Sequence, residues 1–255
     1  MSISSIFNNA FRFPFGNMEK WLVLGILLIL GGLSSVLISF GIDLGAASII
    51  TSIIALVAGL IVSGYSLAIV RDTIHGHDQL PNFDIVENIV DGIKVLILSI
   101  VYSIIPVIVF FVLLIVTGAA EAFIEIINLT MGGATTVPSD LALGFVGSLG
   151  ITLIISLILF IIFSLFPTIA MCRLANTGSF SQGFAFSEII GDFKRIGVGS
   201  FIAWWIVLAI ISVILILISV FISAVPYIGY IISILIIYSF ITIFASRATG
   251  LIYSN

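Results

Sequence analysis

Residues 196–246 read IGVGSFIAWWIVLAIISVILILISVFISAVPYIGYIISILIIYSFITIFAS, a run without one charged side chain. A helix crosses the hydrocarbon core of a bilayer with about 20 apolar residues, so this run is too long for a single crossing. Pro226 and Gly229 interrupt it, and both residue types favour a turn. The run therefore predicts two membrane-spanning helices, near residues 198–222 and 229–246, joined by a tight turn.

The rest of the chain has the same character. Four more charge-free runs predict spans near residues 21–41, 46–70, 94–117 and 145–171. These runs lack the apolar/polar alternation of membrane β-barrel strands. Hydrophobic residues make up 61% of the 255 residues and charged ones 8%, against roughly 45–50% and about 25% in soluble domains. We expect an all-α, polytopic membrane protein with six transmembrane helices, forming a single integral membrane domain over residues 1–255.

The positive charges predict the orientation. The eight Lys and Arg residues are Arg12, Lys20, Arg71, Lys94, Arg173, Lys194, Arg195 and Arg247. With six spans, all eight fall on one side of the membrane. Because cytoplasmic loops carry an excess of Lys and Arg, we expect both termini in the cytoplasm of a cell-membrane protein. The net charge of −4 and the absence of a basic stripe argue against a nucleic-acid partner.

Two loops on the charged side repeat each other. The segments AIVRDTIHG (68–76) and AMCRLANTG (170–178) share the pattern A-x-x-R-x-x-x-x-G, and FDIVENIVDGIK (83–94) aligns with FAFSEIIGDFKR (184–195) after one gap. The recurring residues are Arg71, Gly76, Phe83, Glu87, Asp91 and Lys94 in the first copy, and Arg173, Gly178, Phe184, Glu188, Asp192 and Arg195 in the second.

The spacing of these residues predicts a surface helix. Positions i, i+4 and i+7 share one helical face, and they are acid, acid and base in both copies. Apolar residues lie between them, so each stretch is expected to be a short amphipathic helix in the cytoplasmic interface, which we call an elbow. The N-terminal segment, residues 6–20, has a similar composition. The chain then reads as three elbow-plus-hairpin units, approximately 1–70, 71–172 and 173–255.

The repeated arginines, Arg71 and Arg173, have two possible structural uses. Each ends a span, where it can reach lipid phosphate or cap the last helical carbonyls. Each can instead bind the carboxylates of the neighbouring elbow. We slightly prefer the second use because the arginine and the acids recur together.

Several stretches along the chain resemble a known family. The stretch GYSLAIVRDTIHGHDQLPNFD (64–84), Gly92 before the third span, and the ending Arg247…Gly250…Tyr253 resemble domain of unknown function family four-zero-one-three, whose members are uncharacterised membrane proteins. The resemblance extends over nearly the whole chain. It implies a multi-pass fold, and it supplies no catalytic residues because the family has no established activity.

The histidines suggest a metal site only when taken alone. His75 and His77 precede Asp78 in a Gly-containing loop, and the second copy has Thr177 and Ser179 at the histidine positions. A zinc site needs three or four fixed ligands. We therefore expect a solvated loop, with no metal and no cofactor.

The spans themselves contain no Asp, Glu, Lys, Arg or His, although ion-coupled transporters usually keep such groups. Pro106 and Pro167 each follow a Ser by three residues, and proline kinks a helix. Kinks at these positions either open a cavity or improve packing. A face of small residues on the second span, Ala55, Gly59 and Ser63, is a weak signal for helix contact.

No hydrolase, metalloprotease or nucleotide-binding motif is present in the sequence. Two functions remain. The first is a non-catalytic membrane-organising component that binds lipids, protein partners or further copies of itself. The alternative is a carrier or channel for a neutral or amphiphilic solute.

Overall fold

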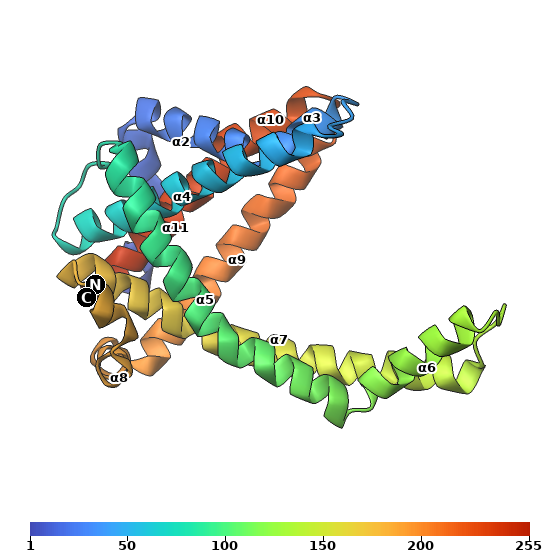
Figure 1. The fold of residues 1–255 in the computed structure, drawn as a ribbon. Helices are drawn as coiled ribbons and strands as arrows, with labels where there is room; N and C mark the ends of the chain where they lie inside the picture. The colour runs from blue at the N-terminus through green and yellow to red at the C-terminus, as the bar shows by residue number, and fades with distance from the viewer. The chain divides into compact units, whose positions relative to one another are not determined.

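The computed structural model describes residues 1–255, which form helices and connecting turns without any β-strand (Figure 1). The elements are α1 Ile3–Arg12, η1 Phe13–Gly16, α2 Met18–Gly31, α3 Leu33–Ser39, α4 Ala47–Ile74, α5 Ile85–Val116, α6 Ala119–Met131, α7 Ser139–Thr177, η2 Phe180–Phe184, α8 Phe186–Ile196, α9 Val198–Ser223, α10 Ile228–Ile232, the π-helical η3 Ser233–Tyr238 and α11 Ser239–Tyr253. The prediction of an all-α fold is confirmed.

Five helical stretches are long and apolar enough to cross a membrane. They are α4, α5, α7, α9 and the continuous run Ile228–Tyr253 made of α10, η3 and α11. Each contains one of the predicted spans or overlaps nearly all of it. The five helices have the length and composition of a polytopic membrane protein.

The first predicted span, 21–41, differs from the expectation. The chain forms α2 up to Gly31 and then a separate short helix, α3, from Leu33. Two consecutive glycines explain the break, because glycine is among the poorest helix formers and exposes its backbone. A further bend of 89° separates α1 and η1 from α2, so the count of membrane-length helices is five, or six if this bent pair forms one span.

The contacts divide the chain into two compact units, which we describe separately. The first comprises residues 1–98 and 168–255, and the second comprises residues 99–167. In the first unit α11 is the most enclosed helix, with nearly all its residues from Ile243 to Tyr253 buried. It packs against α4, α1 and α2, and Figure 1 shows these helices gathered together.

Aromatic side chains join the N-terminal segment to the last helix. Phe11 of α1 packs edge-to-face on Phe240 of α11, with ring centroids 5.1 Å apart. Trp21 of α2 donates its indole N–H to the hydroxyl of Ser239, at 2.7 Å. These contacts bridge more than 200 sequence positions, and aromatic pairs of this kind contribute about 0.5–1.5 kcal/mol each.

The turn predicted between the last two spans is confirmed. Helix α9 ends at Ser223, and α10 starts at Ile228 after Tyr227, whose φ is 64°. Gly229 faces the carbonyl oxygen of Ile222 so closely that a Cβ would lie 2.0 Å from it. Only glycine allows the two helices to approach at this point.

The two predicted elbow segments fold differently. Residues 85–94 are the first turns of α5, which continues without a break to Val116. In the second copy, α8 ends at Ile196, and Gly197 with φ 88° separates it from α9. The expected boundary after Lys94 is therefore absent. The first copy has no residue with positive φ at this point, so nothing ends the helix.

The second unit contains the rest of α5, helix α6 and most of α7. Gly118, with φ 77°, turns the chain between α5 and α6. The hydroxyls of Thr117 and Thr152 lie 2.8 Å apart and link α5 to α7. Most large apolar side chains of this unit are exposed, as expected for helices that face lipid.

Candidate functional site: three arginine-centred clusters

Two of the three arginine-centred clusters lie at the end of a long helix, which is followed by a glycine with positive φ. Helix α4 ends at Ile74, and Gly76 has φ 82°. Helix α7 ends at Thr177, and Gly178 has φ 67°. Glycine adopts this conformation without steric cost and is common just after a helix. In both copies the turn returns the chain toward the arginine that lies one turn before the helix end.

The first cluster surrounds Arg71. Its Nη1 lies 2.8 Å from Oε1 of Glu87, and its Nη2 lies 2.5 Å from Oδ2 of Asp91. Lys94 contacts the other oxygen of Asp91, at 2.7 Å. The Asp91 side chain is only 3% exposed, and a buried carboxylate needs such cationic partners. The four recurring charged residues of the first sequence copy therefore meet at one place.

The second cluster repeats this geometry around Arg173. Its Nη1 lies 2.7 Å from Oδ2 of Asp192, and Glu188 is more distant, at 3.8 Å. Arg195 approaches the other oxygen of Asp192, at 3.5 Å. The guanidinium of Arg173 also donates to the side-chain oxygen of Gln182, at 2.7 Å. The expected contact between each arginine and the acids of the following segment is thus present in both copies.

The C-terminal residues complete the second cluster. The Tyr253 hydroxyl donates to Oδ2 of Asp192, at 2.9 Å, and Arg195 donates to the Tyr253 carbonyl oxygen, also at 2.9 Å. A pocket of about 430 Å³ is lined by residues of this cluster, among them Arg173, Asn176 and Ser254. Sequence reasoning missed this role of Tyr253, because nothing local to the chain's last turn indicates its partner.

The third cluster, around Arg247, was also missed. Arg247 was expected to follow the last span, but α11 continues to Tyr253 and the arginine is buried. It donates to Oδ1 of Asn9 (2.9 Å), the His77 carbonyl oxygen (2.6 Å) and Oδ1 of Asp78 (2.5 Å). The only signal in the sequence was that Arg247, like Arg71 and Arg173, ends an apolar run on the positively charged side.

The backbone packing beside the first cluster is very close. A Cβ on Gly64 of α4 would lie 1.8 Å from the carbonyl oxygen of Asn88, and one on Gly92 of α5 would lie 2.0 Å from that of Leu60. Gly59, which belongs to the predicted small-residue face, has nothing within 4 Å. The prediction that this face makes the helix contact is wrong at Gly59. The contact uses residues on another face of the helix.

The repeated phenylalanines have different partners. Phe83 stacks on the buried Tyr65, with ring centroids 3.8 Å apart and nearly parallel planes. Phe184 packs edge-to-face on Phe180, at 5.1 Å. The Tyr65 hydroxyl also donates to the Pro81 carbonyl oxygen, at 3.0 Å. The loop before the first elbow is therefore held against α4.

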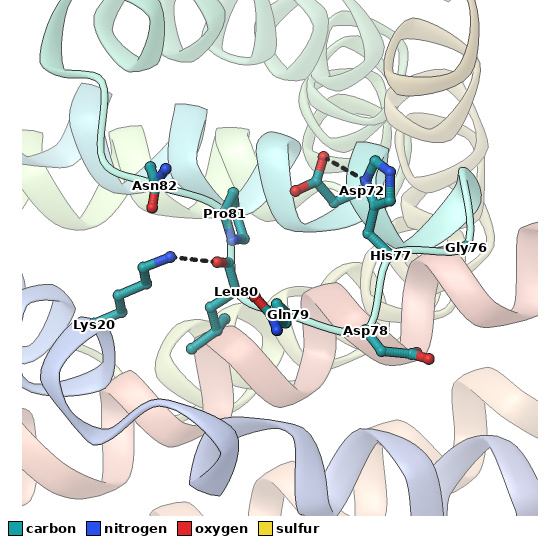
Figure 2. Close-up of a pocket in the computed structure, with 9 residues that line it drawn as sticks. All are labelled: Lys20, Asp72, Gly76, His77, Asp78, Gln79, Leu80, Pro81 and Asn82. Atoms are coloured by element: carbon teal, nitrogen blue, oxygen red, sulfur yellow. Dashed lines mark hydrogen bonds and ion pairs between the residues drawn. The ribbon is translucent and has the colours of Figure 1, made fainter.

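The histidine loop lines a polar pocket of about 550 Å³, drawn in Figure 2. Lys20 donates to the Leu80 carbonyl oxygen, at 2.6 Å, and Nδ1 of His77 lies 3.5 Å from a carboxylate oxygen of Asp72. The structure brings no three His, Cys, Asp or Glu side chains together in a metal-binding arrangement. The loop backbone is instead bound by two cations from elsewhere in the chain, Lys20 and Arg247.

The two Ser-x-x-Pro motifs lie together within the second unit. Pro106 of α5 and Pro167 of α7 line one largely apolar cavity of about 160 Å³, together with Ser103 and Ser164. Each serine donates to the carbonyl oxygen three residues earlier in its helix, at 2.8 Å and 2.7 Å.

The long apolar helices have the length and composition of an all-helical membrane protein. Within that class, the family described as Protein of unknown function (DUF4013) matches residues 47–224, and the chain belongs to this family. The match covers the first cluster and the residues of the second up to Arg195, but not the Arg247…Tyr253 ending, which the resemblance had included. Comparison with curated proteins and with solved structures returns no match.

Proposed function

We propose that this protein is a non-catalytic component of the cell membrane that organises lipids or partner proteins through amphipathic elbows. The carrying observation is the orientation of the elbow side chains. In an ordinary surface helix, acids face water and apolar residues face the core. In residues 85–94 this arrangement is only partly kept, because Glu87 is exposed but Asp91 is buried. Asn88 and Gly92 are buried on the same side. The exposed apolar residues are Ile85, Val86, Val90 and Ile93.

Helix α8 supports the same proposal. Asp192 faces Arg173, whereas Phe186 and Ile190 are exposed. Lys194 and Arg195 lie in its last turn. Apolar side chains beside cations are typical of helices that lie among lipid headgroups, with anionic headgroups attracted to the cations. The elbows would thus hold a lipid or the apolar face of another protein.

The internal repeat and the orientation belong to the proposal. The helices α4 and α7 end in the same way, and Arg71 and Arg173 make corresponding contacts. With six crossings, all cations lie on the cytoplasmic side, together with both termini. For the sixth crossing we propose α2 together with α3, in place of α2 together with α1 and η1, which are bent away from it by 89°. Residues 18–39 would span about 33 Å as a helix, which is sufficient for the hydrocarbon core.

Spin-labelled lipids test the proposal. With the protein reconstituted in liposomes and the nitroxide near the headgroup, electron spin resonance measures the immobilised lipid fraction. The variant Val86→Ser/Val90→Ser should lower this fraction, since it removes apolar contact at the elbow. The control Ile210→Ser/Leu217→Ser changes exposed residues of α9, away from any elbow. An equal effect of both variants would contradict a special role for the elbows.

The cavity between Pro106 and Pro167 supports a second candidate, a carrier or channel for a neutral or amphiphilic solute. Ligand pockets usually enclose about 300–1,000 Å³, so a cavity of about 160 Å³ suits only a small solute. Flux of a solute panel through the same liposomes separates the two functions. Specific flux that is abolished by Pro106→Ala/Pro167→Ala would establish the carrier and overturn the non-catalytic organising role.

A further inference from the structure

We propose that helix α1 is the third elbow, and that each of the three elbow-plus-hairpin units has an arginine that contacts an elbow. In the third contact the arginine takes its carboxylate from the loop 76–82. The proposal rests on the elbows of the proposed function. It concerns contacts within the chain, so it can be tested without a lipid or solute.

The spacing of polar residues in α1 matches the two known elbows. The acid, acid and base positions are Glu87, Asp91 and Lys94 in the first copy, and Glu188, Asp192 and Arg195 in the second. In α1 the same i, i+4, i+7 spacing falls on Ser5, Asn9 and Arg12. The basic residue is retained, and both acids are replaced by neutral polar residues. This replacement explains why the N-terminal segment resembles the two elbows in composition but lacks their acid, acid and base pattern.

Burial gives the same register independently. In each elbow we compare the residue three positions before the one that contacts the arginine. It is Ile6 in α1, Asn88 in α5 and Ile189 in α8, and all three are buried. The shared register places one face of each helix against the rest of the compact unit formed by residues 1–98 and 168–255.

The arginines follow one rule. Arg71 contacts Asp91 of the elbow that comes next in the chain, and Arg173 contacts Asp192 of the elbow after it. Arg247 lies in the last long helix, six residues before its end, and contacts Asn9 at 2.9 Å, in the corresponding elbow position of α1. The third contact therefore joins the last elbow-plus-hairpin unit, residues 173–255, to the first, residues 1–70.

The amide of Asn9 leaves the third arginine without a carboxylate from its elbow. Arg247 is only 3% exposed, and a buried guanidinium requires a counter-charge. Asp78 supplies it at 2.5 Å, although the Asp78 side chain is itself 82% exposed. The loop that carries Asp78 thus supplies the counter-charge in the third contact. This role accounts for the part of the first copy that does not recur in the second.

Compensating substitutions test the assignment. The readout is hydrogen–deuterium exchange of residues 3–12 and 243–253 in the full chain, reconstituted in nanodiscs. Asp78→Asn should raise exchange of α1 by about tenfold, because Arg247 then lacks a carboxylate. Adding Asn9→Asp should return it to the wild-type value, since position 9 becomes equivalent to Asp91 and Asp192. Asn8→Asp is the matched control, because it adds the same charge one residue away.

The outcomes are distinct. Rescue by Asn9→Asp but not by Asn8→Asp supports the proposal, as does slower exchange of α1 in Asn9→Asp alone, a variant that keeps every native contact. Equal behaviour of the two substitutions, or no change in Asp78→Asn, overturns it. Failure of the lipid experiment with successful rescue would reject the proposed function and leave the third elbow in place.

Discussion

Gly64 of α4 lies directly against the backbone of Asn88 in α5, and at the same crossing Gly92, four residues later in α5, lies against Leu60, four residues earlier in α4. No side chain separates the two helices at these points. The crossing brings Asp91, the residue before Gly92, within reach of Arg71, two turns after Gly64. A contact between backbones thus positions the first ion-pair cluster.

Alanine at these glycines should destabilise the fold. The variants Gly64→Ala and Gly92→Ala each place a Cβ about 2 Å from a backbone oxygen, so we expect each to cost about 3 kcal/mol or more of unfolding free energy. Gly59→Ala is the matched control in the same helix, because no atom lies near its Cβ position. Unfolding titrations in mixed detergent micelles provide the measurement. Similar losses in all three variants would contradict the close crossing.

The acids of the first cluster should contribute unequally. Asp91→Asn affects a buried carboxylate and should cost about 3 kcal/mol, whereas the Glu87 side chain is 59% exposed and Glu87→Gln should cost less than about 1 kcal/mol. The double variant Arg71→Gln/Asp91→Asn should cost less than the sum of its single changes, because neither Arg71 nor Asp91 then remains as the unpaired half of their ion pair. Additive losses in this cycle would show that the pair is not coupled.

The turn glycines should tolerate alanine poorly, for a reason that concerns backbone conformation alone. Gly76 and Gly178 have positive φ and no atom near the Cβ position, so Gly76→Ala and Gly178→Ala should each cost about 1–2 kcal/mol. Gly191 lies inside α8 in open space, and Gly191→Ala should be stabilising by about 0.5–1 kcal/mol. The same detergent titrations distinguish the two cases by the sign of the change.

Cysteine labelling tests the number of crossings. Cys172 is the single cysteine and is buried, so replacing it by Ser or Ala provides a background for single cysteines at Ser2, Asp43, Thr135 and Ser254. We expect a membrane-impermeant reagent to reach Ser2→Cys and Ser254→Cys from the cytoplasmic side only, and the other two from the opposite side. Labelling of Asp43→Cys from the cytoplasmic side would show that α2 and α3 do not cross.

The histidine loop and the prolines show why local patterns are ambiguous. His75, His77 and Asp78 have the residue types of a metal site, yet the structure uses the His77 carbonyl and the Asp78 carboxylate to bind Arg247, 169 residues further along the chain. The two Ser-x-x-Pro motifs were each visible in the sequence. That they line one cavity depends on how two helices pack, which no local spacing encodes.

The sequence alone determined the helical class and most of the long apolar helices, and it favoured the pairing of Arg71 and Arg173 with the acids that follow them over their use at the lipid surface. These features depend on hydrophobicity, periodicity and spacing, which are local properties. It did not determine the crossing at Gly64 and Gly92, or the partners of Arg247. Those were decided by the tertiary structure, because a buried charge or a bare backbone takes whichever partner packing brings to it, however distant in sequence.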